Sequence, residues 1–232
     1  ALAPNKALDF AKYIRDKDIE TLITISLDGD ENFHDKIRGI KGNYKKCLKL
    51  YAELKKNDIY SHFGITVSDQ NEEFIKKNYR LFSDSIKAVT FVHSEGIYNK
   101  KNSYENDSKI LNGLKYILKN YKIQKISEII EFMHIKISIK FLENKRNKNI
   151  IPCDVLNTSI HLNPNGDIKP CMFMPSVGNI KSDTINSILK NEKTKLSLEE
   201  IKKNNCPKCW MNCYSPHSIM QHPLKSIIKS IF

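Results

Sequence analysis

The chain has 232 residues, 40% of them hydrophobic, so it is long enough to bury a core and is not expected to be disordered. Its formal charge of +12 comes mainly from lysines scattered among Asn and Ile rather than gathered in an Arg-rich stripe, which argues against a nucleic-acid-binding surface. No apolar run reaches the roughly 18 residues that a membrane span needs, and we expect a cytoplasmic protein.

Helix and strand patterns alternate through the first 145 residues. Apolar residues at helical spacing predict helices in residues 4–17, 43–56, 71–84 and 107–122. Near-continuous apolar runs that end in turn residues predict strands in residues 21–29, 60–68 and 85–96. Alternating strands and helices form a parallel sheet with right-handed crossovers. Three strands leave a parallel edge, which a partner or a further segment must cover.

Two local features of these elements are also predicted. Asn43 is a suitable N-cap for the second helix, because its side chain can accept a hydrogen bond from the first turn. Cys47 shares its apolar spacing with Leu48, Tyr51 and Leu54, so we expect a small buried hydrophobe rather than a reactive thiol.

Polar residues stand where the predicted strands end. They are Ser26 and Asp28 after the first strand, Thr66 and Ser68 after the second, and His93, Ser94 and Glu95 after the third. In parallel α/β folds, binding and catalytic residues gather at this carboxyl edge. Turn formation and helix capping are the alternative roles for each of these residues taken singly.

The last 80 residues of the chain contain five of its six cysteines: Cys153, Cys171, Cys206, Cys209 and Cys213. A chain with a core of this size does not need disulfides, so a metal ion or an iron-sulfur cluster is the better interpretation. The sequence NPNG at 163–166 predicts a hairpin turn with Gly166 at positive φ. A turn centred on Pro164 and Asn165 places Cys171 opposite roughly Thr158, so Cys153 must fold back to join it.

The CxxC of Cys206 and Cys209 is expected to approach the hairpin from the next segment and to present two sulfurs to the same site. Two short helices are predicted between the cysteine pairs, in residues 181–203. Ser182 or Asp183 is the expected cap of the first, and SLEE, residues 197–200, is the expected capping box of the second. The C-terminal residues 223–232 predict an amphipathic helix that docks on the rest of the protein rather than on a membrane surface.

Residues 24–42, TISLDGDENFHDKIRGIKG, combine a strand ending with His-Asp, Arg-Gly and the start of a further helix. This stretch resembles the fourth strand and following loop of radical S-adenosylmethionine (SAM) enzymes, particularly those with a SPASM or twitch extension. The opening APNKALDFAKYI is similar to the segment after the third strand of that family. The resemblance implies that residues 1–149 are the C-terminal half of a (β/α)6 partial TIM barrel. Residues 150–232 would be a small Cys-rich α+β SPASM/twitch-like domain.

The family signature, a CxxxCxxC loop that holds the SAM-cleaving 4Fe-4S cluster, does not occur in these residues. We therefore expect the chain to be the C-terminal part of a larger enzyme and to be inactive alone. For the full-length parent the resemblance implies a radical SAM oxidoreductase or maturase, in which a 5′-deoxyadenosyl radical abstracts hydrogen from a peptide, a protein or a small molecule. A flavodoxin or ferredoxin is the implied electron donor.

The cysteine order, with Gly166 and four further residues leading into Cys171, resembles the auxiliary-cluster region of SPASM and twitch enzymes. It implies one 4Fe-4S cluster on Cys153, Cys171, Cys206 and Cys209, while Cys213 is a fifth cysteine able to replace one of them. Such a cluster accepts or conducts electrons, or binds the substrate directly. The alternative is a zinc site of four cysteines in a non-catalytic binding module.

The resemblance also implies roles for residues outside the cysteine set. Trp210 is expected to pack over the cluster and keep water away. Candidates for contact with the ribose or the methionyl carboxylate of SAM are Ser26, Asp28 and Arg38. Candidates near the adenine are Gly64, Ile65, Thr66, His93 and Ser94.

Overall fold

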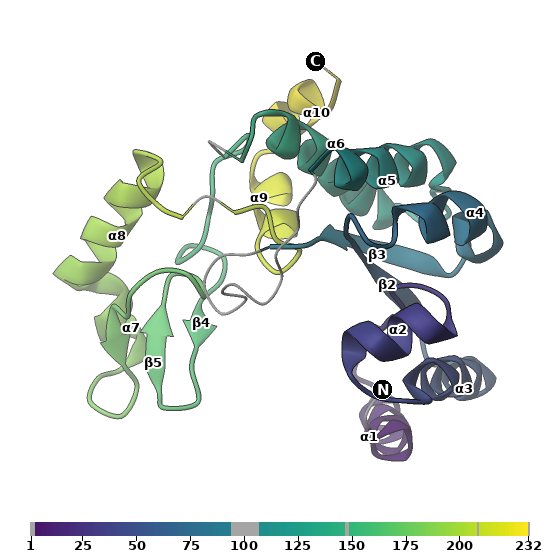
Figure 1. The fold of residues 1–232 in the computed structure, drawn as a ribbon. Helices are drawn as coiled ribbons and strands as arrows, with labels where there is room; N and C mark the ends of the chain where they lie inside the picture. The colour runs from purple at the N-terminus through teal and green to yellow at the C-terminus, as the bar shows by residue number, and fades with distance from the viewer. Residues whose placement is uncertain (1–2, 94–106, 147–148, 208, 232) are drawn as a thin grey trace. The chain divides into compact units, whose positions relative to one another are not determined.

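The computed structural model describes residues 3–93, 107–146, 149–207 and 209–231 (Figure 1). The chain divides into two compact units. The first comprises Ala1–Val92 and Glu105–Glu131, and the second comprises His93–Tyr104 and Phe132–Phe232.

The first unit contains a parallel three-stranded sheet in the order β1-β2-β3 (Figure 1). The strands are β1 (Ile23–Ser26), β2 (Ser61–Val67) and β3 (Ile86–Phe91). All three predicted strands are present, and the predicted parallel pairing is confirmed. The helices of this unit are α1 (Pro4–Asp16), α2 (Glu31–Arg38), α3 (Asn43–Lys56), α4 (Glu72–Phe82) and α5 (Asp107–Asn120).

The two faces of this sheet differ in character because successive strand residues point to opposite sides. One face is apolar and forms the core of the unit with the helices; its buried residues are Ile25, Leu27, Phe63, Ile65, Val67, Val89 and Phe91. The other face carries small or polar side chains, and its strand register aligns Ser26 with Gly64 and Gly64 with Ala88. This second face is partly open and ends at the carboxyl edge of the strands.

The connection from β1 to α3 differs from expectation in two ways. It contains an additional helix, α2, which begins at Asp30, where the side chain accepts a hydrogen bond from Phe33 N at 2.9 Å. The predicted N-cap of α3 is wrong. Gly42, with φ of 77°, occupies the cap position and makes no side-chain bond. Asn43 is instead the first helical residue, and its buried amide contacts His34 Nε2 at 2.9 Å.

Helix α6 (Glu128–Glu143) was not predicted, and its first residues belong to the first unit and the remainder to the second. Apolar and polar residues alternate along Ile135–Phe141, a pattern of period two that is typical of a strand. The helix nevertheless forms because it is enclosed on several sides, with Met133, Ile137 and Phe141 all buried.

The second unit contains an antiparallel sheet of three short strands, β4 (His161–Leu162), β5 (Asp167–Lys169) and β6 (Gly178–Asn179). The predicted hairpin joins β4 to β5, and Gly166 has the predicted positive φ, at 95°. The predicted register is off by one, because the loop has three residues, Pro164–Gly166, and pairs His161 with Lys169. If this strand pairing is extended beyond the ends of β4 and β5, Cys171 falls opposite residue 159 rather than Thr158.

The two predicted helices between the cysteine pairs are α7 (Ile185–Lys190) and α8 (Glu192–Lys202). Both predicted caps are wrong. Thr184 caps α7 through Ser187 N at 3.2 Å, and Asn191 caps α8 through Thr194 N at 2.8 Å. Asn191 follows α7 directly and caps α8 six residues before Ser197, the first residue of the predicted box, so SLEE lies inside the helix.

The C-terminal helices are α9 (Ser215–Gln221) and α10 (Pro223–Ile231). The amphipathic pattern had predicted α10 but not α9. The apolar side chains of Leu224, Ile227 and Ile228 are exposed, and the docking of this face stays a prediction. Among the described residues, no helix has both the length and the apolar character needed to cross a membrane.

Candidate metal centre

Four of the five C-terminal cysteines line one pocket of the second unit: Cys153, Cys171, Cys206 and Cys209. They come from three segments that are far apart in the sequence. Cys153 precedes the bridge between Val155 and Ser159, Cys171 follows β5, and the CxxC pair follows α8.

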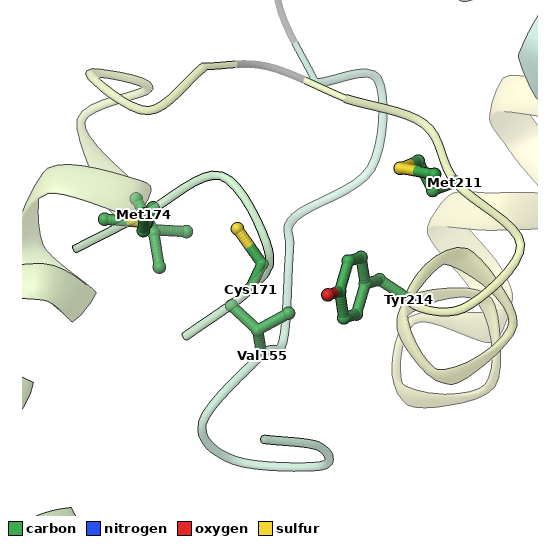
Figure 2. Packing of buried hydrophobic residues seen from close by; sticks show 6 residues of the cluster. Val155, Cys171, Met174, Met211 and Tyr214 are labelled. Atoms are coloured by element: carbon green, nitrogen blue, oxygen red, sulfur yellow. The ribbon is translucent and has the colours of Figure 1, made fainter. Parts of the chain in front are cut away.

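The rest of the pocket wall is largely apolar. Cys171 lies among Val155, Met174 and Tyr214 in a buried cluster, as Figure 2 shows. Cys153, Cys206 and Cys209 pack against the same cluster. The Tyr214 hydroxyl accepts a hydrogen bond from Met172 N at 3.0 Å, which ties the end of the hairpin to the loop that follows the CxxC.

Burial in this apolar pocket raises the pKa of the thiols of Cys153, Cys171 and Cys209. Burial raises the pKa of Cys153 to about 11, because a thiolate loses its hydration in an apolar pocket. Burial also raises the pKa of Cys171 and of Cys209, and the neighbouring thiols act in the same direction. A bound metal supplies the positive charge that stabilises thiolates in such a place, so the donor set fits a thiolate-held metal centre.

The two remaining cysteines are placed differently. Cys213 is exposed and does not line the four-cysteine pocket. Cys47 is buried in α3, as predicted, with its sulfur 3.7 Å from His34 Nε2. In the part of the chain that the structure describes, no three Cys, His, Asp or Glu side chains are close enough together to hold a single metal ion.

Trp210 is buried, but its ring is held by α6 rather than by the four-cysteine pocket. The indole stacks on His134 with ring centroids 5.7 Å apart, and Nε1 donates to the His134 carbonyl at 3.1 Å. Ser215 Oγ lies 2.6 Å from His134 Nδ1. Trp210 lines a neighbouring pocket that shares Cys153 and Cys209 with the first, so it flanks two of the thiols.

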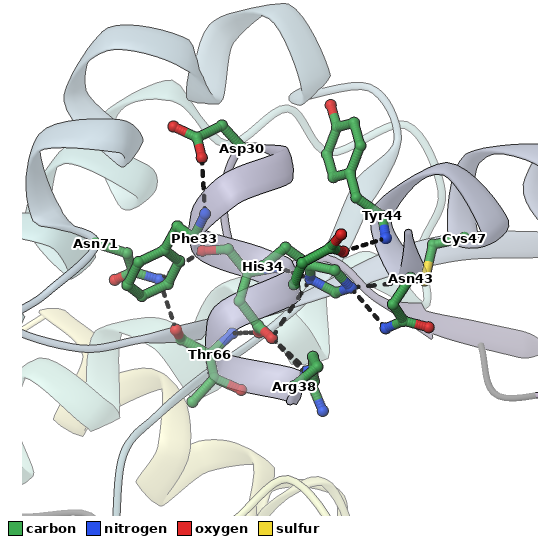
Figure 3. Close-up of polar contacts among 11 residues, drawn as sticks. Asp30, Phe33, His34, Arg38, Asn43, Tyr44, Cys47, Thr66 and Asn71 are labelled. Atoms are coloured by element: carbon green, nitrogen blue, oxygen red, sulfur yellow. Dashed lines mark hydrogen bonds and ion pairs between the residues drawn. The ribbon is translucent and has the colours of Figure 1, made fainter. Parts of the chain in front are cut away.

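In the first unit, Asp28 and Arg38 form an ion pair after β1. Figure 3 shows Arg38 in this corner with Thr66 and His34. Asp28 Oδ2 accepts from Arg38 Nε at 2.6 Å and lies 2.5 Å from Nη2, while Oδ1 accepts from Thr66 N at 3.1 Å. Asp28 is buried, whereas the Arg38 side chain is about one-third exposed. The carboxylate is therefore engaged within the protein, whereas part of the Arg38 side chain is accessible.

Asn71 and His34, the histidine of the His-Asp pair noted in residues 24–42, hold this corner together. Asn71 is buried, and its Nδ2 donates to the carbonyls of Asp28 at 2.8 Å and Thr66 at 2.9 Å, which fixes the ends of β1 and β2. The buried His34 accepts at Nδ1 from Asp28 N at 3.2 Å. Burial lowers the pKa of His34, although the Asp28 carboxylate opposes this shift. No signal beyond its polar character marked Asn71 in the sequence, and the stretch that contains His34 gave no role for its ring.

The structure places the other predicted SAM contacts in different environments. Ser26 is exposed, and Gly64 and Thr66 are partly exposed on the open face of the sheet. The Ile65 side chain is buried on the opposite face, because it alternates with Gly64 and Thr66, and the predicted contact of this backbone segment with the adenine stays a prediction.

His93 belongs to the second unit, where its buried ring hydrogen-bonds the backbone of Trp210. Burial and the charge of Arg146 lower the pKa of His93 to about 4. Its role near the adenine stays a prediction. Ser94 and Glu95 lie outside the described residues.

Residues 153–214 match the SPASM family model, an iron-sulfur cluster-binding domain. The fold is similar to that of native anSMEcpe with bound AdoMet, with a TM-score of 0.58 and 12% identity over 97% of this chain and 70% of that one. Native anSMEcpe with bound AdoMet and Kp18Cys peptide gives a TM-score of 0.58 and 16% identity over 97% and 73% of the two chains. A comparison with curated proteins gave no match.

These similarities confirm the resemblance found in the sequence. The C-terminal unit contains a SPASM-type segment, and the chain has a mixed α/β fold similar to that of the anSMEcpe structures. At these identities the solved structures show the fold, and the chemistry of this chain has to be argued from its own residues.

Proposed function

We propose that this chain holds an auxiliary 4Fe-4S cluster and part of the SAM-binding site of a radical SAM enzyme that acts on a peptide or protein. The observation that carries the proposal is the gathering of four cysteines from three segments around one apolar pocket. Biological 4Fe-4S clusters are held by four Cys thiolates, and this donor set has the required number and type of ligand.

In this proposal Cys153, Cys171, Cys206 and Cys209 each ligate the cluster. Met174 and Tyr214 wall the pocket and restrict the access of water, which influences the potential of an iron-sulfur centre. The bound cluster would supply electron transfer. The match of residues 153–214 to an iron-sulfur cluster-binding family supports iron rather than zinc.

The proposed SAM contacts lie at the carboxyl edge of the first unit. Asp28 holds the Arg38 guanidinium in place, and a planar guanidinium suits the methionyl carboxylate of SAM because it can donate two parallel hydrogen bonds. Gly64 leaves the open face of the sheet without a side chain, so a flat base can approach the backbone there. Ser26 lies beside Gly64 in the strand register and is exposed.

A peptide is the favoured substrate class because two similar structures contain a bound peptide. A small molecule is the alternative substrate class that the sequence resemblance implies, and a flavodoxin or ferredoxin donor, also implied by the resemblance, is part of the proposal. The CxxxCxxC motif does not occur in the 232 residues, so they are not proposed to cleave SAM by themselves.

The test is metal analysis of the chain after anaerobic purification and reconstitution with iron and sulfide. We expect brown protein with about four irons and four sulfides per chain. The Cys47→Ala variant is a matched control, because Cys47 is a buried cysteine of the first unit, and it should retain the same iron content. Colourless protein that holds one zinc would contradict the proposal and establish the zinc-stabilised module.

A further inference from the structure

We infer that Asn149 raises the reduction potential of the auxiliary cluster by donating a hydrogen bond to the sulfur of Cys206. This inference rests on the cluster proposed above and goes beyond it, because it assigns a tuning role to a residue that is not a ligand.

The geometry around Asn149 ties it to the start of the CxxC loop at two points. Its side-chain Nδ2 donates to Cys206 Sγ at 3.8 Å, within the range for a sulfur acceptor. Its backbone N–H donates to Asn204 Oδ1 at 3.3 Å. Asn204 has a φ of 62° and lies just beyond the end of α8. Because 57 positions separate Asn149 from Cys206, the contact is tertiary and not a product of local chain geometry.

Asn149 is also the polar residue that lines both pockets beside the thiols. These pockets share Cys153, Cys209 and Tyr214 as well. The Oδ1 atom of Asn149 is buried without a hydrogen-bond partner among the described residues, although its Nδ2 is satisfied by the sulfur. A buried amide is costly unless it is hydrogen-bonded, so the orientation that directs Nδ2 at Cys206 needs a reason.

The negative charge of the cluster explains why Nδ2 points at Cys206, and it also determines whether the hydrogen bond raises or lowers the reduction potential. A reduced cluster carries one more negative charge than an oxidised cluster, and part of that charge resides on the ligating sulfurs. A hydrogen bond from a neutral amide is therefore stronger in the reduced state, particularly in an apolar pocket of low dielectric. Hydrogen bonds to the sulfurs are among the features that set iron-sulfur potentials. Loss of the Asn149 donor should lower the midpoint potential.

The test compares midpoint potentials of the full chain after anaerobic reconstitution, titrated with dithionite in the presence of mediators and followed by absorbance and EPR. Asn149→Leu removes the donor and keeps a side chain of similar size. Asn205→Leu is the matched control, because Asn205 also precedes the CxxC and its side chain is exposed. We expect the potential of Asn149→Leu to fall below that of the wild type with iron retained, and that of Asn205→Leu to stay unchanged.

A second variant covers the case in which Asn149→Leu loses its iron. Asn149→Asp keeps the shape of the side chain but replaces the donor by a carboxylate, so its potential should fall further still. Unchanged potentials in the iron-loaded variants would overturn the inference while leaving the cluster in place. Loss of iron from both variants would also overturn it, because Asn149 would then be needed for assembly. A wild-type chain that takes up no iron would overturn the proposed function itself.

Discussion

At the scale of single residues, the burial of Asp28 and its two partners indicate what this carboxylate does. A carboxylate that is 4% exposed is unfavourable unless its charge and lone pairs are matched, and Asp28 has Arg38 at one oxygen and Thr66 N at the other. Direct contact with a cofactor is therefore not needed to explain this residue. Its role in our account is to hold Arg38 toward the open edge of the sheet.

The first prediction tests this role through stability. Asp28→Asn keeps the shape of the side chain but removes its charge, so it should lower the free energy of unfolding by about 1–3 kcal/mol. Glu31→Gln is the control, because Glu31 pairs with Lys45 in an exposed ion pair at 2.9 Å, and such pairs contribute about 1 kcal/mol or less. Urea denaturation of both variants measures the difference, and equal effects would contradict the assignment.

The second prediction concerns pH and His93. Its folded-state pKa of about 4 lies below the ordinary value of 6.5, so between these values the unfolded chain binds more protons than the folded chain. The stability associated with neutral His93 is therefore present above pH 6.5 and is lost as the pH falls toward 4. A shift of this size corresponds to at most about 3 kcal/mol.

The measurement is the free energy of unfolding of the wild type and of His93→Gln across this pH window. The wild type should lose stability more steeply than the variant, which has no ionisable group at this position. Parallel pH profiles would show that His93 does not stay neutral in the folded protein.

At the scale of elements, the sequence was informative wherever a single periodicity dominated. Helices α1, α3, α4 and α5 have apolar faces of helical spacing and form where predicted. Helix α6 was missed because Ile135–Phe141 alternates like a strand. The caps at Asn43, Asp183 and SLEE failed because several neighbouring polar residues had the right chemistry and only the tertiary contacts selected among them.

The third prediction tests the hairpin that presents Cys171. Gly166 has a φ of 95°, and a Cβ there would lie 2.8 Å from Asn179 Oδ1, so Gly166→Ala combines backbone strain with a clash. We expect a loss of about 2–3 kcal/mol in the free energy of unfolding. Gly39→Ala is the matched control, because its φ is 67° but nothing lies within 4 Å of the added Cβ, and about 1 kcal/mol is expected there. Chemical denaturation distinguishes the two, and a smaller loss for Gly166→Ala would contradict the close contact.

At the scale of the whole molecule, the sequence predicted which cysteines assemble but not what holds them. Spacing and the hairpin turn suggested Cys153, Cys171, Cys206 and Cys209, and these four line one pocket. The contact of Trp210 with His134 joins residues 76 positions apart, and no local pattern encodes such a pairing. The same holds for Asn149 and Cys206, because tertiary contacts of this kind depend on how complete elements pack.

The fourth prediction concerns the open edge of the parallel sheet. β1 forms one edge of the described sheet, and Ile23 N and Leu27 N donate to β2, so alternation turns the N–H groups of Thr24 and Ser26 away from it. Exposed strand edges recruit other chains, and we expect concentration-dependent self-association in light scattering. Ser26→Lys places a charge at this edge and should reduce the association. A monodisperse monomer at all concentrations would contradict the prediction.

The most direct test of the central claim is the iron content of five single variants: Cys153→Ala, Cys171→Ala, Cys206→Ala, Cys209→Ala and Cys213→Ala. The first four remove a thiol that lines the pocket, and each should leave an iron without its protein ligand and sharply lower the iron bound after anaerobic reconstitution. Cys213→Ala should retain the wild-type content, because its side chain is exposed and lies outside the pocket lining. Retained iron in Cys153→Ala together with loss in Cys213→Ala would contradict the assignment of ligands.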